Sequence, residues 1–320
     1  MTRRNRRKKR VANQIRQLPW RDVVNPYAPS EILSQDQVET IIDTALSVLA
    51  TQGMRFLEPS GRDLLAKAGA QVDGEIVRFD PDFVRESVAQ APAEFGLRAR
   101  NPEHNLTIGG AHTVFTSVGG PAFCSDLDNG RRPGNYAEMC DYLKLVQSLN
   151  IIHQEGGGAF EAMDLPAQTR HLDLYLAQHR LLDKNAQAYA LGRERTIDAI
   201  EMACIALGAD RDELADHPAV LAIINTNSPM QLDTPMTEAV LELAGAGQAC
   251  CITPFTLAGS MSPATLAGTL MQQTAEVLAV ATLAQVVRPG APIMYGSFAS
   301  NVDMQSGSPA LGTPEYTKAA

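Results

Sequence analysis

The sequence predicts an α/β fold: a (β/α)8 TIM barrel that is incomplete at its C-terminus and follows an N-terminal α+β extension. Three similar units between Ala219 and Tyr316 support this prediction, because each has a short apolar run and then a loop of small polar residues. Such apolar runs between turn residues are typical of buried strands, and helical stretches at 234–245 and 264–287 separate the units. Repeated strand–loop–helix units indicate a parallel sheet, whose functional groups gather on the loops at the carboxyl ends of its strands.

Residues 31–110 are predicted to form the N-terminal α+β cap. Ser34 and Gln37 have the spacing of a capping box, so they open a helix that ends at Gly53. Shorter helices are predicted over 60–68 and 82–90, with a hairpin over 71–79 around an Asp-Gly turn. We expect no catalytic group in this region.

Residues 111–320 are predicted to contain about six βα units of the barrel. The first three strand candidates are 113–118, 151–155 and 187–191, and the helices that follow them are 136–148, 169–182 and 197–207. An open doubly wound sheet is the alternative, but no GxGxxG follows a strand near the start of the chain. The chain ends just after the start of a helix, which favours a barrel that lacks its last two units.

Composition excludes several classes of protein. Residues 1–30 form a basic tail and an irregular lead-in, and the first ten residues carry seven Lys and Arg although the whole chain has a net charge of −9. The body is therefore acidic, and we expect no nucleic-acid binding by it. No apolar run approaches the roughly 20 residues of a membrane span. Five cysteines without a CxxC motif, and the absence of a secretory signal, predict a reduced, cytoplasmic protein.

Several loops carry groups that could act on a ligand. Gly156-Gly157-Gly158 is compatible with phosphate binding through backbone N–H groups, and also with a tight strand exit. Glu155 ends a predicted strand, where functional and structural roles are equally common. The polar cluster 225–228 either faces a ligand or caps the following turn.

The later units offer aromatic rings and one carboxylate. Phe255, Tyr295 and Phe298 lie in or directly after predicted strands, where each is either core or site. Asp303 lies in a Gly- and Ser-rich loop, where it is either solvated or faces a cationic ligand. The sequence contains no nucleophile–base pair and no metal-ligand cluster. Either the chemistry needs no strong acid or base from the protein, or the site lies partly in residues that this chain lacks.

Six segments together resemble the trimethylamine methyltransferase (MttB) family. The segment 257–270 (LAGSMSPATLAGTL) is the most specific, and the resemblance covers most of the chain. The supporting segments are Asn225-Thr-Asn-Ser-Pro229, Tyr295-Gly-Ser-Phe298, Gly312-Thr-Pro-Glu-Tyr316, Gly53-Met-Arg-Phe56 and Arg100-Asn-Pro-Glu103. The resemblance implies a TIM-barrel subunit that moves a methyl group from a methylated amine to the cobalt of a separate corrinoid protein.

The resemblance also implies that full-length members continue well past Ala320. The founding trimethylamine enzymes carry pyrrolysine in that later region, whereas many relatives lack it and act on quaternary amines. We therefore expect a C-terminally truncated, non-pyrrolysine member that acts on a quaternary or tertiary amine such as glycine betaine or trimethylamine.

Such a reaction needs a cation pocket rather than a general base, because no proton moves when a quaternary ammonium loses a methyl cation. The substrate-binding candidates on this interpretation are Glu155, Asn225, Asn227, Phe255, Tyr295, Phe298 and Asp303. The candidates for contact with the cofactor are Gly156, Gly157, Gly158 and Ser297. We expect no metal site and no tightly bound cofactor, since the corrinoid is carried by a partner protein, and we expect a homo-oligomer and no membrane partner.

Three alternatives stay open. One is a non-catalytic remnant that binds the amine or the corrinoid partner, and another is a TIM-barrel enzyme for a different small polar substrate. The third is a nucleic-acid binder that acts through the basic tail, with strongly salt-dependent binding.

Overall fold

The computed structural model describes residues 15–120 and 122–319, so the predicted basic tail lies outside the described residues. Ahead of the first helix, β1 (Val23–Val24) pairs antiparallel with β7 (His112–Thr113). The segment before β1 is also held to the rest of the fold, because Gln17 exchanges hydrogen bonds with the backbone of Ser148 and Asn150.

The N-terminal extension has the predicted α+β composition. Ser34 caps the first helix, and the reciprocal bond with Gln37 that defines a capping box is present, as predicted. A small sheet with the order β13-β2-β4-β3 lies among the helices. The elements are α1 (Gln35–Thr51), β2 (Met54–Phe56), α2 (Pro59–Lys67), β3 (Gln71–Asp73), β4 (Ile76–Arg78) and α3 (Pro81–Val88), with β13 (Gln231–Leu232) joining from a later loop.

The main sheet is parallel, and its strands follow the order of the chain. Its strands are β10 (Gln154–Glu155), β11 (Asn185–Ala186), β12 (Leu221–Ile224), β14 (Ala249–Ile252) and β16 (Ile293–Tyr295). Parallel bridges from Thr116 to Gln154 and from Ala188 to Ala222 join these strands into one series. A doubly wound sheet reverses its order at a switch point, and this series does not. Thr116 and β16 stand at its two ends, and they do not pair with each other within residues 15–120 and 122–319.

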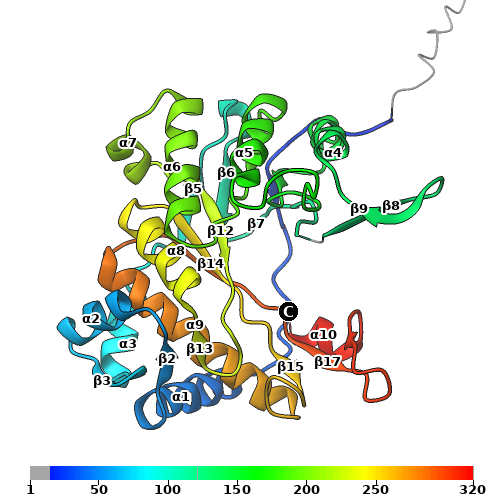
Figure 1. The fold of residues 1–320 in the computed structure, drawn as a ribbon. Coiled ribbons are helices and arrows are strands. Elements are labelled where there is room, and N and C mark those ends of the chain that lie inside the picture. Colours follow the sequence, from blue (N-terminus) through cyan, green and yellow to red (C-terminus); the bar gives the residue numbers. More distant parts are fainter. Residues whose placement is uncertain (1–14, 121, 320) are drawn as a thin grey trace, which may run out of the picture.

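Helices cover the outer face of this sheet (Figure 1). Apart from the short helix 211–216, which was not predicted, their bounds agree with the predicted ranges to within a few residues, and the predicted 136–148 and 234–245 match. The helices are α4 (Tyr136–Ser148), α5 (Arg170–Leu181), α6 (Arg193–Leu207), α7 (Arg211–Asp216), α8 (Thr234–Gly245) and α9 (Leu266–Val287). The last described helix, α10 (Pro314–Ala319), instead lies beside β17 (Ser300–Val302).

Helix α9 is the central helix of the fold. It is long and apolar enough to cross a membrane by length and composition, contrary to the expectation that no run of the sequence approaches this. However, 72% of its most apolar window is buried inside the protein. Helices α1, α3 and α8 pack against it in one hydrophobic core, so α9 is explained as a core helix.

A hairpin covers the inner face of the sheet at the amino-terminal ends of its strands. This hairpin consists of β5 (Glu94–Leu97) and β6 (Leu106–Gly109), linked through a 3₁₀ turn at Pro102–His104. Leu97 and Leu106 pack against Leu221, Ala249 and Cys251 of the parallel strands in a second, smaller core. The predicted extension therefore contributes to both faces of the sheet.

Several short strands were not predicted. A hairpin of β8 (Phe123–Asp126) and β9 (Gly130–Pro133) projects from the body in Figure 1. Another small sheet consists of β15 (Leu257–Ala258), β17 (Ser300–Val302) and β18 (Pro309–Ala310). These pieces lie in the loops that follow the parallel strands, where the sequence is too polar to show strand periodicity.

Candidate active site

The register of the parallel strands determines which side chains face inward. Alternate residues of a strand point to opposite faces, and register partners share a face. Leu221 and Ala249 are partners, and both pack against the hairpin on the inner face. By the same alternation Asn185, Gln187 and Asn225 face inward, whereas Glu155 faces the outer helices.

A cavity of about 290 Å³ lies where the first parallel strands end. Its size is near the lower end of the range for small-molecule sites. Glycines form one wall, and the polar or aromatic side chains on the other walls come from the loops after β11 and β12. The lining residues are Gly119, Gly120, Gly156, Gly157, Gln187, Ala188, Tyr189, Ala190, Leu191, Ile223, Asn225 and Met236.

The glycine wall consists of two loops in backbone contact. A Cβ on Gly119 would lie 2.0 Å from the carbonyl oxygen of Gly156, and one on Gly156 would lie 2.1 Å from that of Ser117. The N–H of Gly120 donates to the carbonyl of Gly158 at 2.8 Å. Any side chain would separate the loops, so close packing explains why glycine is needed at these positions.

Glu155 is fully buried behind this wall. Its carboxylate accepts hydrogen bonds from the N–H groups of Gly157 (3.0 Å) and Gly158 (2.8 Å) and from Gln178 Nε2 (2.7 Å) on α5. Burial raises the pKa of Glu155, although these donors favour the charged form. Of the three N–H groups proposed to bind a phosphate or a cofactor, those of Gly157 and Gly158 are thus bonded to Glu155, and that of Gly156 donates to Ser117 Oγ at 2.9 Å. The predicted substrate role of this carboxylate stays a prediction, and its geometry indicates that it shapes the wall.

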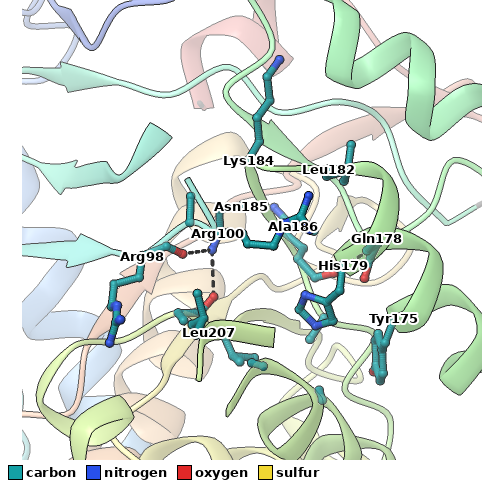
Figure 2. A pocket seen from close by; sticks show the side chains of 17 residues that line it. Arg98, Arg100, Tyr175, Gln178, His179, Leu182, Lys184, Asn185, Ala186 and Leu207 are labelled. Atoms are coloured by element: carbon teal, nitrogen blue, oxygen red, sulfur yellow. Dashed lines mark hydrogen bonds between the residues drawn. The ribbon is translucent and has the colours of Figure 1, made fainter. Parts of the chain in front are cut away.

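Three amide side chains form a ladder on the inner face of the sheet, and two of them, Gln154 and Asn185, are buried. Asn185 Nδ2 donates to the backbone carbonyls of Arg98 (2.7 Å) and Ala219 (2.8 Å), as the dashed lines in Figure 2 show. Gln154 Nε2 donates to Asn185 Oδ1 at 2.6 Å, and Gln187 Nε2 donates to Gln154 Oε1 at 3.2 Å. We call Asn185, Gln154 and Gln187 the amide ladder. It runs from the amino ends of the strands to the cavity.

A smaller cavity of about 40 Å³ lies at the opposite, amino-terminal ends of the strands (Figure 2). Side chains of α5 and α6 and the base of the amide ladder line it, together with Arg98 and Arg100. It lies away from the loops that carry the polar candidates, so we place no chemistry there.

The polar loop 225–230 is anchored to α9 through Thr226, Ser228 and Met230. The fully buried carboxylate of Glu276 accepts from the hydroxyls of Thr226 and Ser228 and from the N–H of Met230 (2.8 Å). Gln272 Nε2 donates to the same carboxylate at 2.9 Å. This contact leaves Asn225 at the cavity wall. The sequence did not identify Glu276, because a glutamate within a helix is ordinary until its contacts are known.

Asn227, another predicted substrate-binding residue, is used at the start of α8. Its amide pairs with Asp233, which accepts at 3.2 Å and donates its own N–H to Asn227 Oδ1 at 2.9 Å. Asp233 caps the helix. The alternative role suggested by the sequence, capping of the turn, describes this geometry.

The aromatic candidates lie together at the far end of the sheet. Phe255 and Phe298 stack with ring centroids 4.6 Å apart, and Tyr316 meets Phe298 edge-on at 6.4 Å. Tyr295 is the register partner of Ile252 and points outward, where its hydroxyl contacts Thr274 (3.0 Å) and Gln273 (3.2 Å) on α9. Burial of this hydroxyl raises the pKa of Tyr295, although half of the whole residue is exposed. These rings do not line the 290 Å³ cavity.

Ser297 and Asp303 are engaged in local contacts. The Ser297 hydroxyl donates to Gln273 Oε1 at 3.1 Å, and Thr256 donates to the same oxygen at 3.3 Å. Asp303 accepts from the hydroxyl of Ser306 (2.6 Å) and the N–H of Gln305 (3.1 Å). The hydroxyl of Ser306 is the main cause that lowers the pKa of Asp303. The roles of both residues toward a ligand stay predictions.

The described residues contain no group of three or more His, Cys, Asp or Glu side chains placed to hold a metal ion. Burial raises the pKa of Cys250 to about 12 and also raises that of Cys251, so neither is poised as a thiolate nucleophile. The site therefore offers shape, amide dipoles and one aromatic ring, Tyr189, rather than an acid–base pair.

Comparisons with known proteins agree on one family. The family model for trimethylamine methyltransferase (MTTB) matches residues 1–320. The glycine betaine methyltransferase of Desulfitobacterium hafniense (strain Y51) is 38% identical over 284 residues, which are 89% of this chain and 59% of that protein. The proline betaine:corrinoid methyltransferase of Eubacterium limosum is 25% identical, over 91% of this chain and 61% of that protein. This chain thus spans about three fifths of the length of these relatives.

A solved structure adds evidence on the fold. The monomethylamine methyltransferase MtmB of Methanosarcina barkeri superposes with a TM-score of 0.53 at 10% identity, over 89% of this chain and 57% of that one. At this identity the likeness concerns the fold alone.

Proposed function

The chain belongs to the trimethylamine methyltransferase (MTTB) family, and from this premise we propose that it binds a methylated amine and presents it for methyl transfer to a corrinoid protein. The observation that supports the proposal most directly is the 290 Å³ cavity at the carboxyl ends of the strands, which is where α/β folds place their sites. We further propose that the five parallel strands and the segment at Thr116 are part of a TIM barrel, since they pair in chain order.

A betaine is the substrate class that we favour. The relatives at 38% and 25% identity are named for glycine betaine and proline betaine. A quaternary ammonium carries a positive charge but has no N–H group, so it cannot donate a hydrogen bond. A pocket therefore recognises it through the partial negative charge of amide oxygens and through aromatic faces. Asn225, Gln187 and Tyr189 supply such groups in the cavity.

The proposed methyl transfer requires no general acid or base from this chain. The C–N bond breaks with its electron pair staying on nitrogen, so the amine leaves neutral and no proton has to move. A corrinoid, carried by a separate protein, supplies the nucleophile that accepts the methyl group. The residues of this chain hold the ammonium in place and direct one methyl group outward, which is catalysis by orientation. We propose that this takes place in the cytoplasm.

Two measurements test the proposal. Titration calorimetry of the chain with glycine betaine and with trimethylamine measures binding, and proton NMR measures formation of dimethylglycine or dimethylamine when reduced cobalamin is added. We expect binding of glycine betaine and formation of dimethylglycine. Binding without product would support the non-catalytic alternative, and failure to bind any methylated amine would overturn the proposal.

A further inference from the structure

The amide ladder has a fixed direction. A backbone carbonyl can only accept a hydrogen bond, so the two carbonyls at its base require the nitrogen of Asn185 to face them. Asn185 Oδ1 must then accept from Gln154 Nε2, and Gln154 Oε1 must accept from Gln187 Nε2. Each amide sets the orientation of the next, so none of the three can flip alone without losing its bonds.

The ladder ends on an oxygen that has no partner. Gln187 Nε2 is engaged with Gln154, so Gln187 Oε1 is the remaining polar atom of the last amide. Within residues 15–120 and 122–319 no hydrogen bond is made to this oxygen, and it is not among the enclosed, unpaired polar atoms. Gln187 faces inward and is one of the residues that line the 290 Å³ cavity, so a ligand held there can reach its side chain. Because the ladder fixes the orientation of this amide, it presents an acceptor of fixed direction to any ligand that occupies the cavity.

The surroundings define the chemistry of that ligand. An amide oxygen carries partial negative charge, and Tyr189 and Asn225 line the same cavity as Gln187. No Asp, Glu, Lys or Arg lines this cavity in the described part of the chain. The cavity thus combines oriented dipoles with an aromatic face and no fixed charge, which suits a bulky, weakly hydrated cation better than an anion or a metal ion.

We infer that Gln187 is the residue that recognises the positive charge of the ligand, and that Asn185 and Gln154 are positioning residues that hold its oxygen toward the cavity. The inference rests on the proposed function, because it takes the ligand to be a quaternary ammonium. It names the residue that distinguishes this cation from an uncharged group of the same shape. Asn185 and Gln154 act only through Gln187, since neither lines that cavity.

A pair of matched probes tests this selectivity. Glycine betaine and 3,3-dimethylbutanoate have the same shape and the same carboxylate, but the second has carbon in place of the ammonium nitrogen. Titration calorimetry of the chain gives the ratio of their dissociation constants. We expect about a tenfold preference for glycine betaine in the unmodified chain, falling to about twofold in Gln187→Leu.

Two further variants separate recognition from stability. Gln154→Leu leaves the cavity lining intact but frees the Gln187 amide to turn, so we expect an intermediate preference. Gln248→Leu is the control, because Gln248 is an equally buried amide that accepts from Ala219 and Val220 and lies at the amino ends of the strands. It should lower stability and leave the preference unchanged.

The outcomes are distinguishable. If the unmodified chain does not bind glycine betaine, the proposed function and this inference both fail. If it binds with a preference that Gln187→Leu does not change, the inference alone is overturned. An equal loss of preference in Gln248→Leu would also overturn it, since the effect would then be general loosening of the fold.

Discussion

Two polar networks lie on opposite faces of the sheet: the amide ladder on the inner face and polar side chains of α9 on the outer face. Both contain amide side chains, but they differ in whether their last acceptor is paired within the protein. We call Gln272, Gln273 and Glu276 the α9 network. In that network the carboxylate of Glu276 receives four hydrogen bonds, and Gln273 joins Thr256, Ser297 and Tyr295. The ladder instead ends on a free oxygen at a cavity. Closed buried networks make a structure rigid, whereas an open one is available to a ligand.

The α9 network holds three successive loops on the outer face of the sheet, and the amide ladder leads to the cavity on the inner face. The α9 network contacts the loops after β12, β14 and β16 through Ser228, Thr256 and Ser297. Changes in it should therefore affect stability first. Changes in the ladder should affect ligand selectivity first.

The largest effect on stability is expected for Glu276→Leu. The change leaves two hydroxyls and the N–H of Met230 buried without an acceptor, which should lower the free energy of unfolding by about 3 kcal/mol. Urea unfolding followed by circular dichroism measures it, and Glu276→Gln should lose less because one oxygen stays. A loss below about 1 kcal/mol for Glu276→Leu would show that the network does not hold the loop.

A smaller loss is expected when the glycine wall is opened. In Gly156→Ala the new Cβ would lie 2.1 Å from the carbonyl oxygen of Ser117, so the two loops must separate, at a cost of about 2 kcal/mol in unfolding free energy. Affinity for glycine betaine should fall as well, because the wall lines the cavity. The matched control is Gly96→Ala, where a Cβ meets nothing within 4 Å. Equal unfolding free energies for the two variants would refute the close-packing explanation.

Tyr295→Phe tests whether the outer face contributes to binding. It removes the hydrogen bonds to Thr274 and Gln273, and we expect a loss of about 1 kcal/mol in unfolding free energy. Calorimetry should show a smaller effect on glycine betaine affinity than Gln187→Leu does. A several-fold loss in Tyr295→Leu and Phe298→Leu, which the sequence-based interpretation expects, would instead move the cation site to the aromatic group.

The smallest effect on stability is expected for Lys184. This residue lies next to Asn185 in the sequence, but all three N–H donors of its ammonium group are hydrogen-bonded. Its Nζ donates to the carbonyls of Val146 (3.0 Å), Leu149 (2.7 Å) and Ile152 (2.8 Å). Burial lowers the pKa of Lys184 to about 8 from its ordinary value of 10.5, so between these pH values the folded state holds fewer protons than the unfolded state. Stability contributed by this group therefore rises with pH through that window.

The three carbonyls favour the charged form and oppose the desolvation that lowers this pKa, so we expect a rise of only about 1 kcal/mol. Urea unfolding at pH 8, 9 and 10 measures the rise, and Lys184→Met should lack it. An identical pH dependence in the variant would contradict the assignment to Lys184.

Much of the fold follows from local patterns. The capping box at Ser34 and the 3.6-residue periodicity of α4 and α8 fix those helices without reference to tertiary contacts. The strand predictions were less accurate, since β10 covers only Gln154–Glu155 of the predicted 151–155 and β11 lies just before the predicted 187–191. The predicted 113–118 is not a parallel strand, because Thr113 belongs to the antiparallel β7 and Thr116 forms only an isolated bridge. The apolar run marks a buried segment, but hydrogen bonding to a neighbouring strand decides how much of it is paired.

The site could be predicted only in part. Asn225 and the glycine loop, which the sequence singled out because polar or glycine residues directly after a buried strand are visible in sequence, line the cavity, and their roles toward a ligand stay predictions. The amide ladder was missed, because Gln154 and Gln187 are brought together by strand register. The signal that could have found it is an amide residue at an inward position in each of two neighbouring strands. Glu276 has no such signal, since its partners lie about 50 residues earlier.

The most direct test is a crystal structure of the chain soaked with glycine betaine. The account predicts that the trimethylammonium group lies in the cavity between Gly157 and Asn225, with methyl carbons in contact with Gln187 Oε1. An ammonium group located instead on the stacked pair Phe255 and Phe298, with the cavity occupied only by water, would contradict it.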